Sequence, residues 1–522
     1  CRRLDGLPLA IELAAARVRG MSVEELAARL DDRFGLLTGG SRTAPARHQT
    51  LQATIDWSYE LLSEDDRALF AGLAVFRGGW TLPAAEHVCA AHPNVMNGLF
   101  SLVDRSLVVA DESGGTTRYR FLESIGAYAR ARFEALPDSA PLQERHADYM
   151  AEQAGWGLTL DGNARLGWLA RMATEEANLM AALEWSASDS RQPEQKLRIA
   201  ATLGLVWSYN GRSRDVRSRL GPLADDRVPP ESPAGARLLG CLAWAATDLA
   251  EYDDAEALCR RVEAAARTQA DLRLLGDGLR WRALVAERRG DVPLMEDLMQ
   301  AARACYVDAQ DRLGQASVLT GLALPRMHRR DFDAVRRLLD EARRLAGEDD
   351  DFIVAQIGHE AAYAAFAQGD YHAARDAAAD SLRRYSRIGH AGGSILALVA
   401  AALAATDLGQ AEEAASYLTE ALGQARRTGA EWGRTYGLAA ASYWALRQAR
   451  MRPAAELMAA FLAALDARGV EPIPLASELA AIVRDETGGL TDAWQRGMQM
   501  GVDDALRLAL DELAHTTGSE RE

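Results

Sequence analysis

A repeat of about 40 residues in the second half of the chain constrains its fold more than any other feature. The turn Gly-Asp-Tyr-His-Ala-Ala at residues 369–374 serves as the template, and equivalent turns recur at intervals of 39 or 40 residues. They begin at Gly211, Ala250, Gly290, Arg330, Gly369, Gly409 and Ala449. A constant period of this length is typical of stacked repeat units, so the sequence predicts a repeat array over residues 200–490.

Two other positions keep the same period. The residue seven places before each turn is small, and the residue five places after it is apolar. The small residues are Gly204, Ala243, Ala283, Ala323, Ala362, Ala402 and Ser442, and the apolar ones are Val216, Ala255, Met295, Val335, Ala374, Ala414 and Ala454. Leu239, Leu242 and Ala246 illustrate the i, i+3, i+7 spacing of a helix face. We therefore expect stacked pairs of antiparallel helices, which resemble the tetratricopeptide repeat (TPR) in a longer form.

Composition excludes several classes of function. The net charge of −16 argues against a dominant nucleic-acid surface, because phosphate binding needs clustered basic residues. The only lysine, Lys196, has no glycine-rich loop before it, so the chain cannot form a P-loop by itself. Five cysteines without a C-x-x-C motif are typical of free thiols in a cytoplasmic protein. Motifs of serine hydrolases and zinc proteases are absent, which argues against an enzyme activity of this chain alone.

The first 136 residues follow a different plan. Helices are expected at 51–62, at 64–76 after a capping Ser63, from Leu82 and from Val95, with Gly78-Gly79 ending the second. Strands are expected at 106–110 and 118–122 around a loop at 111–115, followed by a helix over 124–135. Several helices followed by one hairpin are the plan of a winged helix. Residues 137–199 are expected to form a helical junction, and 491–522 a C-terminal helix and tail.

Several ordered motifs resemble bacterial STAND-type regulators, a family of signal-transduction ATPases with an NB-ARC-like core. Gly6, Leu7, Pro8 and Leu9 look like the family's G-L-P-L motif. Residues 48–59, 102–108 and 119–125 are similar to its winged helix, and Glu-Glu-Ala-Asn-Leu at 175–179 is similar to its helical junction. The resemblance implies an ATPase-module end at 1–48, a winged helix at 49–136, the junction, and TPR-like sensor repeats. It extends to LuxR-type and antibiotic-regulator-like members.

The family resemblance also implies a mechanism. An ATPase core holds ADP, a protein or small-molecule signal binds the repeats, ATP replaces ADP, and the protein oligomerises and controls transcription. ATP or ADP would be the cofactor of the full-length protein, with none expected for this chain alone. Gly6, Leu7, Pro8 and Leu9 would lie near the nucleotide, although Pro8 also suits the first turn of a helix. Relatives carry Met-His-Asp where this chain has Phe-Leu-Glu at 121–123, so the histidine that meets ADP is missing.

Two other functions stay open: the regulatory part of a multidomain nucleotide cyclase, and a stand-alone TPR scaffold for protein–protein interaction. DNA is expected to contact a domain outside this chain, because the helix from Val95 is mostly apolar. His87, Cys89 and His92 do not share a helix face, which favours a core cysteine with two surface histidines over a metal site. The acidic run at 348–351 is expected to be a solvated loop that caps the next helix.

Aromatic residues recur on the first helices of the repeats. Core packing accounts for most of them, while some are expected to line a concave groove that binds the signal. The sequence does not separate the two groups. The residues are Trp207, Tyr209, Trp244, Trp281, Tyr363, Phe366, Tyr443 and Trp444.

Overall fold

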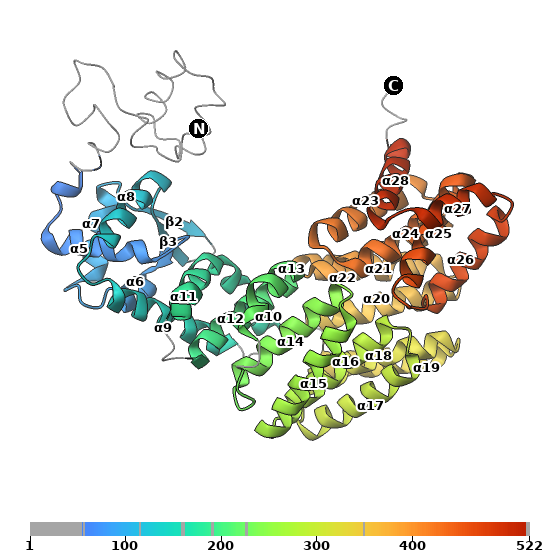
Figure 1. Cartoon of the computed structure of the whole chain (residues 1–522), viewed down its shortest axis with the longest axis horizontal. Coiled ribbons are helices and arrows are strands. Elements are labelled where there is room, and N and C mark those ends of the chain that lie inside the picture. Colours follow the sequence, from blue (N-terminus) through green and yellow to red (C-terminus); the bar gives the residue numbers. More distant parts are fainter. Residues whose placement is uncertain are drawn as a thin grey trace, which may run out of the picture. The chain divides into compact units, whose positions relative to one another are not determined.

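The computed structural model describes residue 55 and residues 58–113, 116–157, 162–188, 193–224, 228–347 and 350–517. These residues are mainly helical and contain one sheet of three short strands, which confirms the prediction of a mainly helical solenoid (Figure 1). They form two compact units. The first comprises the described residues up to Gly155 together with Thr174–Ile199, and the second comprises Trp156–Ala173 and the residues from Ala200 onward. The predicted ATPase-module end at 1–48 lies outside the described residues.

The first unit contains helices packed around the three-stranded sheet, in the arrangement of a winged helix. Its elements are α5 Glu64–Gly72, the 3-10 turn η4 Leu73–Val75, β1 Trp80–Thr81, α6 Leu82–Val88, α7 Val95–Asp104, β2 Val109–Ser113, β3 Thr116–Arg120, α8 Glu123–Glu134, α9 Ala140–Gly157 and α11 Glu176–Ser188. The strand order is β1-β3-β2, with both pairs antiparallel. The predicted cap is present, since Ser63 Oγ accepts a hydrogen bond of 3.1 Å from Asp66 N.

The predicted hairpin is correct in kind and wrong in its boundaries. β2 starts at Val109, three residues later than expected, and continues through Ser113 into the predicted loop. The reason is that the apolar Leu107 and Val108 end helix α7. Both of their backbone N–H groups donate to the carbonyl of Leu102, at 3.0 and 3.2 Å, and both side chains are buried. The two-residue strand β1 was not predicted.

Asn178 joins the junction helix α11 to the sheet of the first unit. Its side chain is fully buried and accepts a hydrogen bond from Arg77 N at 2.7 Å. It also donates to Gly79 O at 2.8 Å and to Glu175 Oε2 at 2.6 Å. Glu175 in turn pairs with the Arg118 guanidinium on β3. The residues that resembled a family motif at 175–179 therefore hold α11 against the turn before β1.

Replacing Asn178 by alanine is expected to destabilise the first unit by about 2 kcal/mol, because the Arg77 N–H loses its partner in a buried place. The Gly79 carbonyl would keep its hydrogen bond from Arg118 Nη2, at 3.2 Å. Losing the Asn178 amide would therefore cost less free energy at Gly79 than at Arg77. Limited proteolysis and urea unfolding measure the loss. The control is Asn97→Ala on the exposed side of α7, where a change within about 0.5 kcal/mol is expected. Equal stability of the two variants would contradict the role assigned to Asn178.

The second unit is an array of helices of similar length (Figure 1). Its elements are α10 Gly162–Thr174, α12 Pro193–Tyr209, α13 Ser213–Asp215, η5 Val216–Leu220, η6 Gly221–Leu223, α14 Pro233–Asp248, α15 Tyr252–Gln269, α16 Leu272–Arg288, α17 Val292–Asp308, α18 Arg312–His328, α19 Phe332–Ala346, α20 Asp351–Ala367, α21 Tyr371–Arg387, α22 Ala391–Asp407, α23 Ala411–Thr428, α24 Glu431–Arg447, α25 Met451–Asp466, α26 Pro474–Thr487, α27 Thr491–Gln499 and α28 Val502–Thr517. Of these, α12 begins within the first unit.

The predicted turns between paired helices share one backbone conformation. All seven starting residues, glycine or not, have a left-handed φ between 55° and 80°. At the template turn, Gly369 has a φ of 80°, Asp370 N donates to Ala365 O at 3.0 Å, and the Asp370 side chain accepts from Ala373 N at 3.1 Å. One residue thus closes the first helix and the next residue caps the second. The helix–turn–helix unit predicted from the repeat is confirmed.

A second set of left-handed residues ends most of the second helices. These residues are Ala270, Gln310, Gly389, Gly429 and Gly469. They lie about midway between the predicted turns, so the chain turns roughly every 20 residues. The sequence pattern revealed only one of the two sets, because alanine and glutamine stand at two of these positions and carry no turn signal.

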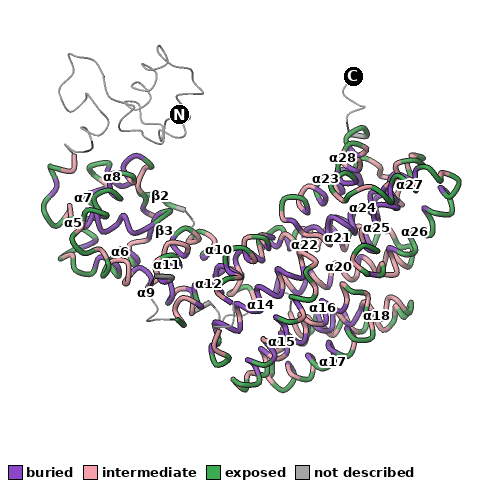
Figure 2. The backbone as a smooth tube through the Cα atoms, in the orientation of Figure 1, coloured by how far each residue is buried: buried purple, intermediate pink, exposed green. Residues whose placement is uncertain are grey.

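The small and apolar repeat positions lie at the interface within each helix pair. All fourteen are buried (Figure 2). In the last pair, Ser442 Oγ on α24 donates to Ala454 O on α25 at 2.6 Å, so one small residue touches the partner backbone directly. At the end of the array, α28 buries Leu506 and Leu513 in the same core cluster as α24 and α25. This helix covers the apolar face of the last repeats.

The array curves until its beginning meets later repeats. The ring of Tyr209 on α12 lies 5.2 Å from that of His390, which begins α22. Gly211 lies so close to Thr428 that a β-carbon at Gly211 would be 2.5 Å from Thr428 Cγ2. Further along, Arg330 Nη1 pairs with Glu478 Oε1 at 3.3 Å. These contacts join segments that lie far apart in the sequence and face each other across the inner side of the array.

Candidate ligand-binding cavity

The first helices of the pairs line a cavity of about 290 Å³ on the inner face of the array. Helices α14, α16, α18, α20, α22 and α24 contribute, and α26 completes the wall. The second helices of the pairs contribute fewer lining residues, among them Met299, Phe332 and Tyr385. Most of the wall is aromatic or aliphatic, as is usual for small-molecule sites. The main apolar residues are Trp244, Trp281, Leu284, Leu324, Phe352, Tyr363, Leu396 and Trp432.

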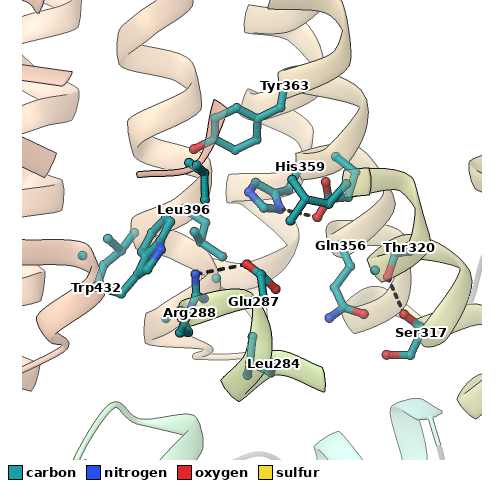
Figure 3. A pocket seen from close by; sticks show the side chains of 18 of the residues that line it. Leu284, Glu287, Arg288, Ser317, Thr320, Gln356, His359, Tyr363, Leu396 and Trp432 are labelled. Carbon is teal, nitrogen blue, oxygen red and sulfur yellow. Dashed lines mark hydrogen bonds and ion pairs between the residues drawn. The ribbon is translucent and has the colours of Figure 1, made fainter. Parts of the chain in front are cut away.

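Polar side chains enter this apolar wall from α16 and α20. Arg288 Nη1 donates to Glu287 Oε1 at 3.3 Å, and the Arg288 guanidinium lies 4.6 Å from the ring centroid of Trp432. On α20, His359 Nδ1 lies 3.6 Å from Glu360 Oε1. Figure 3 shows these side chains directed toward the same space from facing helices.

Seven buried polar atoms at this cavity have no hydrogen-bond partner among the described residues. They are Ser208 Oγ, Trp281 Nε1, His328 Nε2, Gln356 Oε1, His359 Nε2, His390 Nε2 and Trp432 Nε1. Burying a polar group without a partner costs about 1–3 kcal/mol, so such groups are rare in a folded interior. Because these atoms are concentrated around one cavity, water or a bound molecule in that cavity can satisfy them.

The charges at the cavity are unequal in number. Its lining contains the carboxyl groups of Asp248, Glu287, Glu360 and Glu478, and the guanidinium groups of Arg280, Arg288 and Arg330. Four carboxyl groups against three guanidinium groups leave one acidic group in excess. The three lining histidines do not redress the balance, because burial lowers the pKa of each below its usual value.

Among these acids, Glu360 has a strongly perturbed pKa. Burial raises the pKa of its carboxyl to about 8, the nearby Glu287 carboxylate adds to the rise, and Arg288 opposes it. Burial also lowers the pKa of its neighbour His359 to about 3. Near neutral pH, Glu360 therefore holds a proton that a bound positive charge would displace.

A second cavity of about 180 Å³ shares a wall with the first, formed in part by Trp244, Arg280 and Trp281. Most of its carboxylates already bind the protein. Those of Asp271, Asp311 and Asp350 cap helices at 2.9–3.0 Å, and that of Asp277 accepts from the Tyr306 hydroxyl at 2.6 Å. We interpret this cavity as a structural polar interface.

Asp350 belongs to the acidic run that was expected to be a solvated cap. It does cap α20, but it is only 6% exposed, and the expected solvation is wrong. Its neighbour Asp351 is also buried and pairs with Arg384 Nη1 at 2.8 Å and Arg387 Nη1 at 3.1 Å. Asp351 is buried because α21 brings both guanidinium groups to it at the start of α20.

The other residues that the sequence singled out as site candidates differ in position and burial. Gly6, Leu7, Pro8 and Leu9 lie outside the described residues. Cys89 is a core residue, as expected, and burial raises the pKa of its thiol to about 12. His87 is exposed. The expectation of a second surface histidine is wrong: the His92 side chain is 9% exposed, with Nε2 4.0 Å from Asp66 Oδ1.

The outer face of α7 does not resemble a DNA-reading helix. Met96, Asn97, Phe100 and Asp104 are exposed there, and the first basic residue is Arg105, after the helix. Two apolar side chains, one carboxylate and a single amide offer little to a phosphate backbone or to base edges.

The structure separates the repeat aromatics that the sequence left together. Trp207, Tyr443 and Trp444 are core residues, whereas Trp244, Trp281 and Tyr363 line the main cavity. Tyr209 lines the second cavity, and Phe366 packs beside the core cluster of the last repeats. Sequence reasoning missed the polar residues of the site. A usable signal was present, because Gln356, His359 and Glu360 interrupt the otherwise apolar helix α20 at the spacing of one helix face.

Comparison with known proteins gives relatives for part of the chain. No protein-family model matches it. Over 260 residues, 48% of this chain, it is 43% identical to proteins of Mycobacterium tuberculosis and Mycobacterium bovis named "Putative HTH-type transcriptional regulator". The match spans 29% of the length of those regulators. Over 157 residues the chain is 40% identical to an uncharacterized protein of Mycobacterium tuberculosis, covering 29% of this chain and 40% of that protein.

Two solved structures are similar at low sequence identity. One is the crystal structure of a STAND protein with a tetratricopeptide repeat sensor from Pyrococcus horikoshii, with 15% identity, a TM-score of 0.40, and coverage of 97% of this chain and 74% of that one. The other is a Rap protein complexed with competence and sporulation factor, with 11% identity, a TM-score of 0.44, and coverage of 72% and 100%. No helix among the described residues is long and apolar enough to cross a membrane. Over about half its length, the chain is thus related to bacterial proteins named as transcriptional regulators.

Proposed function

We propose that this chain is the sensor part of an ATP-dependent, STAND-type switch that controls transcription, and that its repeat cavity binds the signal. One observation carries the sensor role: a cavity surrounded by buried polar atoms that have no partner among the described residues. The relation to transcriptional regulators over 48% of the chain supports the regulatory output. A cavity of about 290 Å³ suits a small-molecule signal better than a folded protein, because a folded partner would need a larger surface.

The cavity is well placed to convert binding into a change of shape. Its wall includes Ser208 near the start of the array and Glu478 near the end. A ligand that contacts both ends of this wall would stabilise the closed curvature of the array relative to a more open one. Such a ligand shifts the equilibrium by its difference in affinity for the two states. The nucleotide would be held by parts of the full protein that include Gly6 to Leu9 and a P-loop lysine, which this chain does not supply.

The protein encoded by the complete reading frame tests the regulatory proposal. Wild type and Leu284→Trp, which places a large ring in the cavity, would each be returned to a strain that lacks the gene. We expect wild type to restore the transcripts that the deletion alters and Leu284→Trp to fail, as measured by RNA sequencing. Leu338→Trp on α19, away from the cavity lining, is the matched control. Unchanged transcripts in the deletion strain, or full restoration by Leu284→Trp at equal protein levels, would overturn the sensor role.

Nucleotide analysis tests the switch separately. The purified full-length protein is expected to carry ADP or ATP in a ratio near one per chain, released on denaturation and identified by chromatography. A full-length protein that neither carries nor binds nucleotide would refute the ATP-dependent switch and leave the sensor role intact.

A further inference from the structure

We propose that the cavity recognises a small primary amine with an apolar, ring-containing body, whose ammonium group binds Glu360. This inference rests on the proposed function and names the chemical class of its signal. Three observations lead to it: one carboxyl group without a matching positive group, acceptor atoms on a single helix face, and an aromatic wall.

Among the described residues, Glu360 is the carboxyl group of the lining that has neither a guanidinium nor a hydroxyl partner. Glu287 pairs with Arg288 at 3.3 Å, and Glu478 pairs with Arg330 at 3.3 Å. Asp248 accepts a hydrogen bond of 2.8 Å from the Ser213 hydroxyl. Among the described residues, the nearest polar partner of Glu360 is the imidazole of His359, at 3.6 Å. A cation bound at Glu360 would therefore supply the positive partner that this carboxyl group lacks among the described residues.

The acceptors that surround this position lie on one face of α20. Gln356, His359, Glu360 and Tyr363 stand at i, i+3, i+4 and i+7, and all four line the cavity (Figure 3). With Glu360 ionised, His359 Nδ1–H faces its carboxylate, which leaves His359 Nε2 as an acceptor. His359 Nε2 and Gln356 Oε1 both lack partners among the described residues. An ammonium group has three N–H donors, which match Glu360, His359 and Gln356.

The rest of the wall suits an apolar ring and one hydrogen-bond acceptor. The guanidinium of Arg288 already lies 4.6 Å from the ring centroid of Trp432, so this wall holds a positive group against an aromatic face. Trp281 and Trp432 each present an indole N–H without a partner among the described residues. Because indole nitrogen only donates, these two atoms favour a ligand that also carries a carbonyl, hydroxyl or ether oxygen.

The test uses three compounds that share an indole ring and differ in charge: tryptamine, its neutral alcohol tryptophol, and the anion indole-3-acetate. Isothermal titration calorimetry on the full chain measures binding. We expect tryptamine to bind at least about tenfold more tightly than tryptophol and the anion not to bind, since one ion pair in a dry site contributes about this factor or more. Phenethylamine and 5-hydroxytryptamine extend the series. If none of the three amines binds, the proposal is wrong.

Two variants link the preference to Glu360. Glu360→Gln is expected to weaken tryptamine at least about tenfold and to leave tryptophol unchanged, because it removes the charge and keeps the shape. Glu420→Gln, on the exposed side of α23 and outside the cavity lining, is the control and should bind tryptamine as wild type does. Circular dichroism of both variants confirms folding. Undiminished binding of tryptamine to Glu360→Gln would overturn the assignment.

Different experimental results would overturn this inference and the proposed function. If tryptophol or indole-3-acetate bound as tightly as tryptamine, and Leu284→Trp abolished that binding, the cavity would remain a sensor site while the amine class would be wrong. If Leu284→Trp still restored transcripts fully, the sensor role itself would fail, whatever the amines do.

Discussion

Replacing Trp444 by alanine is expected to lower the free energy of unfolding of the repeat unit by about 4 kcal/mol, within the usual range for a buried aromatic. Trp444 lies on α24 with its side chain fully buried in the core cluster of the last repeats. Its indole N–H donates to Ala411 O at 3.1 Å, and the Arg450 guanidinium lies 5.3 Å from its ring centroid. Alanine would leave a cavity among α22, α23 and α25, which rigid helices cannot close. Urea unfolding followed by far-ultraviolet circular dichroism measures the loss.

Trp432, twelve residues earlier on the same helix α24, provides the contrast. It lines the ligand cavity, it is only partly buried, and its indole N–H has no partner among the described residues. Trp432→Ala is expected to cost about 1 kcal/mol, because the ring already borders empty space and little packing is lost. Equal losses for the two tryptophans would show that the division between core and cavity wall is wrong.

The contrast between these tryptophans shows what the repeat pattern could predict. The period fixed the helix pairs, the turns and the small residues between helices, because each depends on residues within one repeat. Tyr443 stands six residues before its turn, as do Trp244 and Tyr363, yet Tyr443 is a core residue while the other two line the cavity. Whether an aromatic faces the core or the inner cavity depends on the curvature of the whole array, and that curvature is set by contacts such as Tyr209 with His390.

The candidate site was less predictable than the fold for the same reason. Its walls come from helices up to about 270 residues apart, between Ser208 and Glu478, and no local motif joins them. The polar residues of α20 were the available signal, and a search for charged residues inside apolar helices would have found Glu360. In the first unit, the boundaries of the hairpin failed because Leu107 and Val108 look like strand residues and instead close α7.

Glu360 is expected to make the repeat unit less stable as the pH rises, and Glu360→Gln is expected to remove that effect. The folded protein raises the pKa of this carboxyl from 4.5 to about 8, chiefly through burial. Between these two values the folded state binds a proton that the unfolded state has released. The contribution to stability therefore falls as the pH increases through this window and becomes constant above about pH 8.

At about pH 7, Glu360→Gln should be more stable than wild type by on the order of 2–3 kcal/mol, and at about pH 5 by less than about 1 kcal/mol. Urea unfolding at both pH values measures the difference. The lowered pKa values of His359 and His390, about 3 and 4, make both proteins less stable below about pH 6.5, so this loss cancels in the comparison. Glu420→Gln on the exposed side of α23 is the control and should not change stability at either pH. A pH-independent difference between wild type and Glu360→Gln would contradict the buried, unmatched state of this carboxyl.

A stabilising substitution at about pH 7 would instead mean that the chain keeps a costly acid where only a bound cation makes its charge favourable.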